Sequence, residues 1–143
     1  MYDMYHVLEP EVAGGLGPRT VMGASTHPPV VSKLHYQLDG WLGDELLESF
    51  PCFVVTENMR TLIETCEPTG CSFDVVELSV SEQFMELYGN RIIPNFWWLK
   101  INGKAGHDDF GISNQNELVV SERVVRIMRE AQLDNCDIDE YQN

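Results

Sequence analysis

Apolar positions along the chain fall into short runs and helical spacings that predict alternating strands and helices. Residues 52–56 (CFVVT) form a β-branched run that is typical of a buried strand. Thr56 is expected to cap a helix, because its hydroxyl can accept an N–H of the first turn that has no partner within the helix. The apolar face of this helix is predicted to consist of Met59, Leu62 and Ile63.

The same reasoning predicts the other elements. Further strands are expected over residues 1–8, 30–38, 71–78, 96–101, 117–121 and 136–141, with a loop over residues 9–29. Further helices are expected over residues 45–49, 82–88 and 122–131, the first two capped by Asp44 and Ser81. Asn102-Gly103 predicts a hairpin with a returning strand. The last helix is expected to bury Val124, Ile127 and Met128.

A strand-cap-helix pattern occurs twice, at an offset of 65 residues. Phe53-Val54-Val55-Thr56-Glu57 matches Leu118-Val119-Val120-Ser121-Glu122, and Cys71 matches Cys136. Two explanations remain open: a duplication of one segment, or independent convergence of two segments on the same strand-cap-helix pattern. We therefore expect an α+β fold in which residues 1–143 form a single domain, with a mixed β-sheet that carries two strand-helix-strand units.

Charge narrows the range of partners. The chain has 23 acidic and 9 basic side chains and a formal net charge of −14, to which residues 1–50, 51–100 and 101–143 contribute −5, −4 and −5. Such a surface disfavours binding to nucleic acid phosphates or to anionic membranes. An evenly acidic domain is either simply soluble or adapted to a cationic partner, whose approach its electric field accelerates.

The cellular location follows from what the chain lacks. No apolar run approaches the roughly 18 residues of a membrane span, and Met1 to Pro10 do not have the pattern of a secretory signal. We expect a cytoplasmic protein whose four cysteines stay reduced. None of them forms a CxxC pair, so we interpret them as small buried apolar residues.

Two clusters could carry chemistry or binding. His107-Asp108-Asp109 lies in a polar loop and could hold a divalent cation or act in acid-base catalysis, or it could simply close a turn. Phe96, Trp97 and Trp98 lie on a strand, so Trp97 is expected to face away from the other two. One face serves the core, and the other could meet a partner.

Motifs in the second half of the chain carry a resemblance. Residues 96–101 (FWWLKI), 108–112 (DDFGI), 118–123 (LVVSER) and 136–138 (CDI) follow one another in that order, after Asp39-Gly40-Trp41-Leu42-Gly43-Asp44 and Phe53-Val54-Val55-Thr56. The sequence resembles a bacterial immunity-protein family of polymorphic toxin systems, the eleventh immunity class, over about residues 30–141. It lacks the paired CxxCG of a related family.

The resemblance implies a cytoplasmic protein that neutralises a cognate antibacterial toxin by binding it, without catalysis. We expect no cofactor and no required metal. From the charge we expect the toxin to present a basic face. Asp108 and Asp109 in the loop, with Asp137, Asp139 and Glu140 at the C-terminal end, are the acidic contact candidates; Trp97 and Trp98 are the apolar ones. The alternatives are a small enzyme that uses His107, Asp108 and Asp109, and an adaptor or chaperone for a secreted effector.

Overall fold

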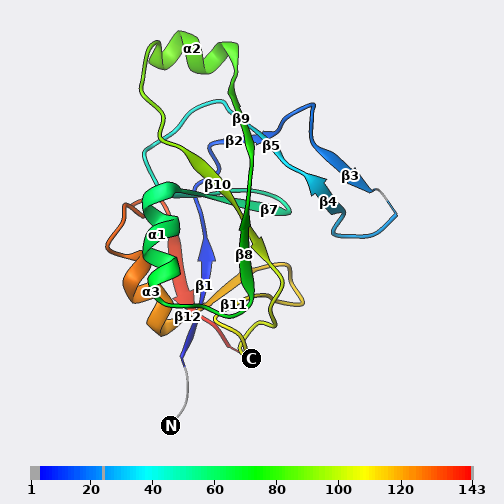
Figure 1. The fold of residues 1–143 in the computed structure, drawn as a ribbon, viewed down its shortest axis with the longest axis vertical. Helices are drawn as coiled ribbons and strands as arrows, with labels where there is room; N and C mark the ends of the chain where they lie inside the picture. Colours follow the sequence, from blue (N-terminus) through cyan, green and yellow to red (C-terminus); the bar gives the residue numbers. More distant parts are fainter. Residues whose placement is uncertain (1–3, 24, 143) are drawn as a thin grey trace.

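Two four-stranded sheets form the centre of this computed structural model, which describes residues 4–23 and 25–142 (Figure 1). The first sheet has the order β6 (Leu46–Ser49), β7 (Cys52–Thr56), β10 (Phe96–Ile101), β8 (Cys71–Asp74). The second has the order β11 (Phe110–Ile112), β12 (Leu118–Ser121), β1 (Tyr5–Glu9), β13 (Asp137–Glu140). All neighbouring strands in both sheets are antiparallel.

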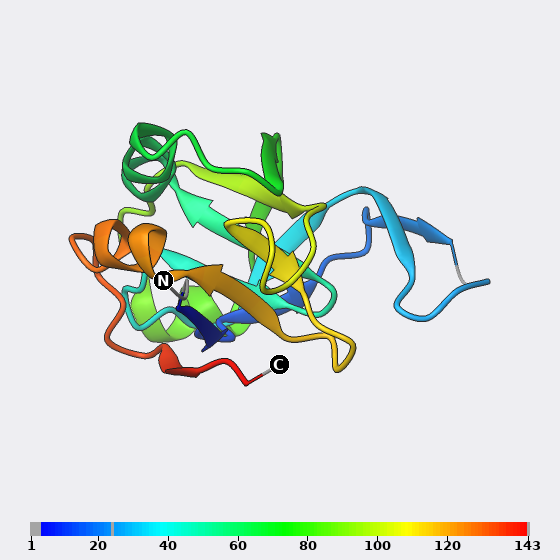
Figure 2. The same ribbon diagram turned by 90° about the horizontal axis from the view of Figure 1, so that it is seen from below.

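The helices that follow β7 and β12 lie side by side (Figure 2). The first, α1 (Glu57–Thr65), begins as predicted, because the Thr56 hydroxyl accepts the Met59 N–H at 3.1 Å. The second, α3 (Glu122–Met128), ends three residues before the predicted end. It buries Val125 along with two of the predicted residues, whereas Ile127 is only half-buried. Its buried face is therefore turned relative to the prediction.

The two predicted strand-helix-strand units, β7-α1-β8 and β12-α3-β13, are present, and the α+β class is confirmed. Each unit has a sheet of its own instead of sharing one. In each, the two strands joined by the helix are parallel, with one antiparallel strand between them. The central strands are exchanged between the two halves of the chain. β1 precedes the first unit in the sequence but lies in the sheet of the second unit. β10 precedes the second unit in the sequence but lies in the sheet of the first.

The correspondence between the two sheets extends to strand register. Seven of the eight residue pairs that join β10 to β7 and β8 have a counterpart among the pairs that join β1 to β12 and β13. Matching positions include Phe53 and Leu118, Leu99 and Leu8, and Phe73 and Ile138. If the two halves had only converged on the same local strand-cap-helix pattern, β1 and β10, which lie outside that pattern, would have no reason to pair in the same register. The structure therefore favours duplication over convergence.

A third layer covers the other face of the first sheet. It consists of the mixed sheet β2 (Gly14–Leu16), β5 (His35–Leu38), β9 (Glu77–Val80), and of α2 (Glu82–Tyr88), which Ser81 caps as predicted. Two cores result, one on each face of the first sheet. Strand alternation places Trp97 against the core shared with α1 and α3, and Phe96 and Trp98 in the other, as predicted.

A two-stranded ribbon, hereafter the arm, stands away from these layers (Figures 1 and 2). It consists of β3 (Val21–Gly23) and β4 (Val30–Lys33). The predicted loop over residues 9–29 thus contains two short strands. The predicted strands over 30–38 and 71–78 are each divided between two sheets, because the chain changes layer within them. Part of the predicted strand over 1–8 lies outside the described residues.

Three further local predictions are wrong. Ser121 does not cap α3 with its side chain, because its hydroxyl donates to Asp109. Residues 46–49 form the edge strand β6 instead of a helix, because Leu46 and Leu47 both become fully buried as the strand pairs with β7. No strand returns along β10 after Asn102-Gly103. Both N–H groups of that turn donate instead to the carbonyl of Gly70, at 2.8 and 3.0 Å, and β11 pairs with β12. None of the helices in the described residues has the length and apolar character of a membrane span.

Candidate functional site

Asp109, an acidic contact candidate, is 9% exposed and bound on both carboxylate oxygens. The backbone N–H of Thr69 donates to Oδ2 at 2.9 Å, and the hydroxyl of Ser121 donates to Oδ1 at 2.7 Å. The Arg123 guanidinium forms a two-pronged ion pair, at 3.0 and 2.7 Å. Burial by itself would raise the pKa of this carboxyl, but these donors hold it below its usual range. Asp109 thus binds within the fold.

Asp44 occupies the matching position in the first half of the chain, at the same offset of 65. It is fully buried and accepts the N–H groups of Asp134 at 3.0 Å and Asn135 at 2.8 Å, after α3. Asp109 likewise binds Thr69, in the loop after α1. Each carboxylate therefore accepts backbone N–H groups from the loop between helix and strand in the opposite half of the chain. Asp44 has this role and does not cap a helix, although the sequence predicts such a cap.

The other members of the predicted loop cluster do not join Asp109. Asp108 is half-buried and accepts the Lys104 N–H at 2.7 Å, which closes the turn. The His107 side chain is exposed. Within the described residues, no three His, Cys, Asp or Glu side chains gather as metal ligands would.

The two tryptophans lie in different environments. Trp97 is half-buried beneath the Arg60 guanidinium, whose central carbon lies 4.3 Å from the ring centroid. Trp98 is 6% exposed, and the Lys100 ammonium lies 4.7 Å from its ring centroid. Both rings are therefore covered by cations of this chain. Trp98 borders an open cavity.

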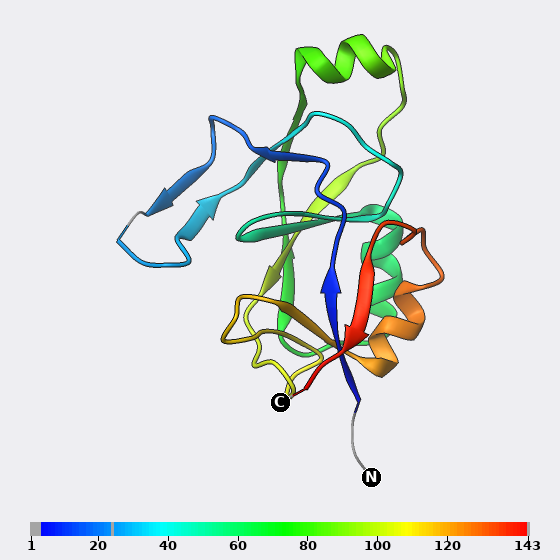
Figure 3. The same cartoon turned by 180° about the vertical axis from the view of Figure 1, so that it is seen from behind.

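The C-terminal acids belong to a larger group, hereafter the acidic strip, which consists of Glu9, Asp137, Asp139 and Glu140. β1 and β13 lie side by side (Figure 3). Glu9 on β1 pairs with Asp137 on β13, and all four side chains are exposed. In the part of the chain that the structure describes, no ion pair joins them to a Lys or Arg. The strip thus presents uncompensated negative charge along a sheet edge, where β13 has a partner on one side only.

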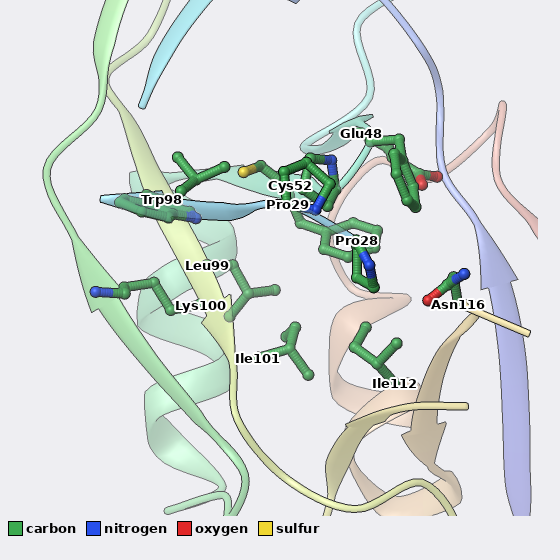
Figure 4. Close-up of a pocket in the computed structure, with 14 residues that line it drawn as sticks. Pro28, Pro29, Glu48, Cys52, Trp98, Leu99, Lys100, Ile101, Ile112 and Asn116 are labelled. Carbon is green, nitrogen blue, oxygen red and sulfur yellow. The ribbon is translucent and has the colours of Figure 1, made fainter. Parts of the chain in front are cut away.

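A cleft of about 310 Å³ lies between the arm and the body (Figure 4). Pro28, Pro29 and Val31 of the arm face it from one side, and the body contributes Phe50, Pro51, Trp98, Ile101 and Ile112. Glu48 is the one acid among its lining residues, and burial, with a smaller effect of nearby Glu9, raises the pKa of this carboxyl. The cleft is therefore mainly apolar.

Sequence reasoning missed Glu9 and the cleft. Glu9 lies far from the C-terminal acids in the chain, so only the pairing of β1 with β13 brings them together. A signal for the cleft was present, because residues 12–38 and 87–107 contain no Asp or Glu in so acidic a chain. The first run contains the arm, and the second contributes Trp98 and Ile101 to the cleft wall.

All four cysteines are free, and burial raises the thiol pKa to about 11 for Cys52 and Cys71 and to about 12 for Cys136. An unperturbed thiol has a pKa of about 8.5, so at pH 8 these three are expected to react with iodoacetamide at least about 100-fold more slowly than a free thiol. Mass spectrometry of peptides after timed labelling measures this, with urea-unfolded protein as the control. Equal rates in folded and unfolded protein would contradict the burial of these thiols.

Comparison with known proteins adds no assignment. No protein-family model matches the chain, and no curated protein matches it.

Proposed function

We propose that this protein is an immunity protein that binds a cognate antibacterial toxin in the cytoplasm and neutralises it by stoichiometric occlusion, without catalysis. The order of motifs from residue 96 to residue 138 supports the family. The observation that carries the proposal is the acidic strip, because it concentrates exposed, uncompensated carboxylates along an open sheet edge.

The strip fits a toxin that acts on an anionic substrate. Such an enzyme needs Lys and Arg around its cleft to meet phosphates. Carboxylates placed against that cleft complement its charge and exclude the substrate, while long-range attraction raises the rate of association. We therefore place the acidic contact surface at the strip and not at the loop. The Asp109 carboxylate is ion-paired with Arg123, and the Asp108 carboxylate accepts the Lys104 N–H within its own turn.

The protection test starts by sequencing the neighbouring genes, and a secreted protein encoded there with a C-terminal toxin domain supplies the candidate toxin. Its C-terminal toxin domain is expressed in a bacterial host with and without the full immunity chain, and growth is measured. We expect growth to be restored and the purified pair to form a complex of one chain each. Unrestored growth, together with no complex, would overturn the proposed function.

The strip is tested by Asp137→Asn plus Asp139→Asn. Removing two uncompensated charges is expected to lower the rate of association with the toxin about tenfold at low salt, with less difference at high salt, where screening shortens to about 3 Å at 1 M. Stopped-flow fluorescence measures the rates.

Glu82→Gln plus Glu86→Gln is the matched control, because it removes the same charge from exposed positions on α2. If the strip acids only prevent edge-to-edge aggregation, the Asn variant will aggregate while keeping its association rate. Equal rates for the two double variants would remove the strip from the interface.

A further inference from the structure

The arm is the least supported part of the fold. In the described residues, β3 and β4 pair only with each other, which leaves an unpaired backbone edge on each side. An isolated two-stranded ribbon is marginal in water, and three or more strands or a packing partner usually stabilise it. The arm also exposes apolar side chains: Val21 is 53% exposed, Met22 48% and Val30 67%.

The arm and the cleft form one acid-poor surface. The arm contains no Asp or Glu, and its Lys33, like Arg19 at its base, forms an ion pair with Glu77. The ring of His27, near its tip, lies 5.9 Å from the ring of Phe50 on the β6–β7 turn, so arm and body meet across the cleft. Because interface cores are depleted in charged residues, this surface has the composition of a docking face.

Charge distinguishes among the possible occupants. A basic partner is attracted to the acidic surfaces of this chain and gains no electrostatic advantage at the acid-poor face. A second copy carries the same net charge of −14, so two copies repel each other over most of their surfaces. They can approach closely at the arm and the cleft, where Glu48 is the one acid among the lining residues and burial raises the pKa of its carboxyl.

We propose that the arm and the cleft at its base form the contact between two copies of this chain. Pairing of the arms joins one open edge of each arm to that of the other copy and brings Val21, Met22 and Val30 into the contact. An isologous two-fold contact closes on itself, so it forms a dimer without forming filaments. The acidic strips remain outside this contact, so the dimer goes beyond the proposed toxin binding and does not depend on it.

Salt gives the dimer a distinctive signature. An apolar contact between two like-charged bodies tightens as salt screens their repulsion. Raising salt from about 0.1 M to about 1 M shortens the screening length from about 10 Å to about 3 Å. Sedimentation equilibrium of the full chain is expected to show a mass of twice 16.3 kDa, with a dissociation constant that falls as salt rises. Association with a basic toxin changes in the opposite direction.

Two variants locate the contact. Met22→Glu and Val30→Glu each place a charge in the apolar contact and are expected to raise the dimer dissociation constant at least about tenfold. Ile92→Glu is the matched control, since Ile92 is 89% exposed in the loop after α2 and the change adds the same charge. Circular dichroism checks that all three variants fold.

Three outcomes would overturn the proposed dimer. A chain that stays monomeric up to millimolar concentration at both salts would overturn the dimer, as would arm variants that dissociate no more readily than Ile92→Glu. A monomer whose toxin binding is lost in Val30→Glu would assign the arm to the toxin and would also overturn it. Protection measured in cells is a separate readout, so failure of the dimer is distinguishable from failure of the proposed function.

Discussion

Asp109→Ala is expected to lower the free energy of unfolding by about 3 kcal/mol, a large fraction of the roughly 5–15 kcal/mol of a typical domain. The substitution leaves the Thr69 N–H and the Ser121 hydroxyl without their acceptor and leaves Arg123 without its ion-pair partner. The Arg123 side chain is 56% exposed, so water can solvate its guanidinium once the partner is gone. The expected loss of unfolding free energy therefore lies at the lower end of the range for breaking a buried ion pair. Urea denaturation measures the change.

Asp108→Ala is the control, because it removes the same group from the neighbouring residue. Asp108 accepts one backbone N–H at a partly exposed turn, so its loss is expected to cost about 1 kcal/mol. Asp44→Ala is expected to match Asp109→Ala, since the substitution removes a fully buried acceptor that three N–H donors share. Equal losses for Asp108→Ala and Asp109→Ala would contradict the structural role of the ion pair.

The stabilisation that the Asp109 carboxylate provides is also expected to decrease at low pH. Because the folded state lowers the pKa of this carboxyl, its contribution to stability is fully present above the unfolded value of about 3.9. The contribution is lost as pH falls through the lower pKa of the folded protein. The difference between wild type and Asp109→Ala is therefore expected to be constant near neutral pH and to shrink below about pH 4.

Val125→Asp is expected to prevent stable folding, because Val125 is 1% exposed in the core between the two sheets and their helices. A buried carboxylate with no partner costs several kcal/mol, and cavity formation adds to this. Ile127→Asp is the matched control in the same helix, where the half-buried side chain can turn toward water, and we expect about 1–2 kcal/mol. Circular dichroism and urea denaturation compare the two.

This pair tests the rotation of α3. Helical spacing in the sequence places Ile127 on the buried face, whereas the structure places Val125 there. A larger loss in Ile127→Asp than in Val125→Asp would support the phase predicted from sequence and contradict the packing described above.

Local signals located most of the central elements. The run 52–56, the hydroxyl of Thr56 and the spacing of Met59 and Ile63 act within one turn or one strand, so the sequence shows them directly. Leu62, predicted on the same face of α1, is only half-buried. Such signals fail where burial depends on a distant strand. Leu46-Leu47 become a strand because β7 lies beside them, and Asn102-Gly103 forms no hairpin because its N–H groups reach Gly70.

The candidate contact residues show the same limit. From sequence, Asp108 and Asp109 are equivalent acids in a polar loop. Only the folded chain places Arg123 against Asp109, since the two lie on different elements. Glu9 joins the C-terminal acids for the same reason, through the pairing of β1 with β13.

The sequence by itself determined the α+β class, the two strand-helix-strand units, the N-caps at Thr56 and Ser81, and the acidic net charge. Each of these depends on neighbouring residues or on composition. The tertiary structure decided the exchange of β1 and β10, the matched roles of Asp44 and Asp109, the acidic strip and the arm with its cleft. These features join segments far apart in the chain, and the free energy that selects them comes from burial and hydrogen bonding between those segments, which no local pattern records.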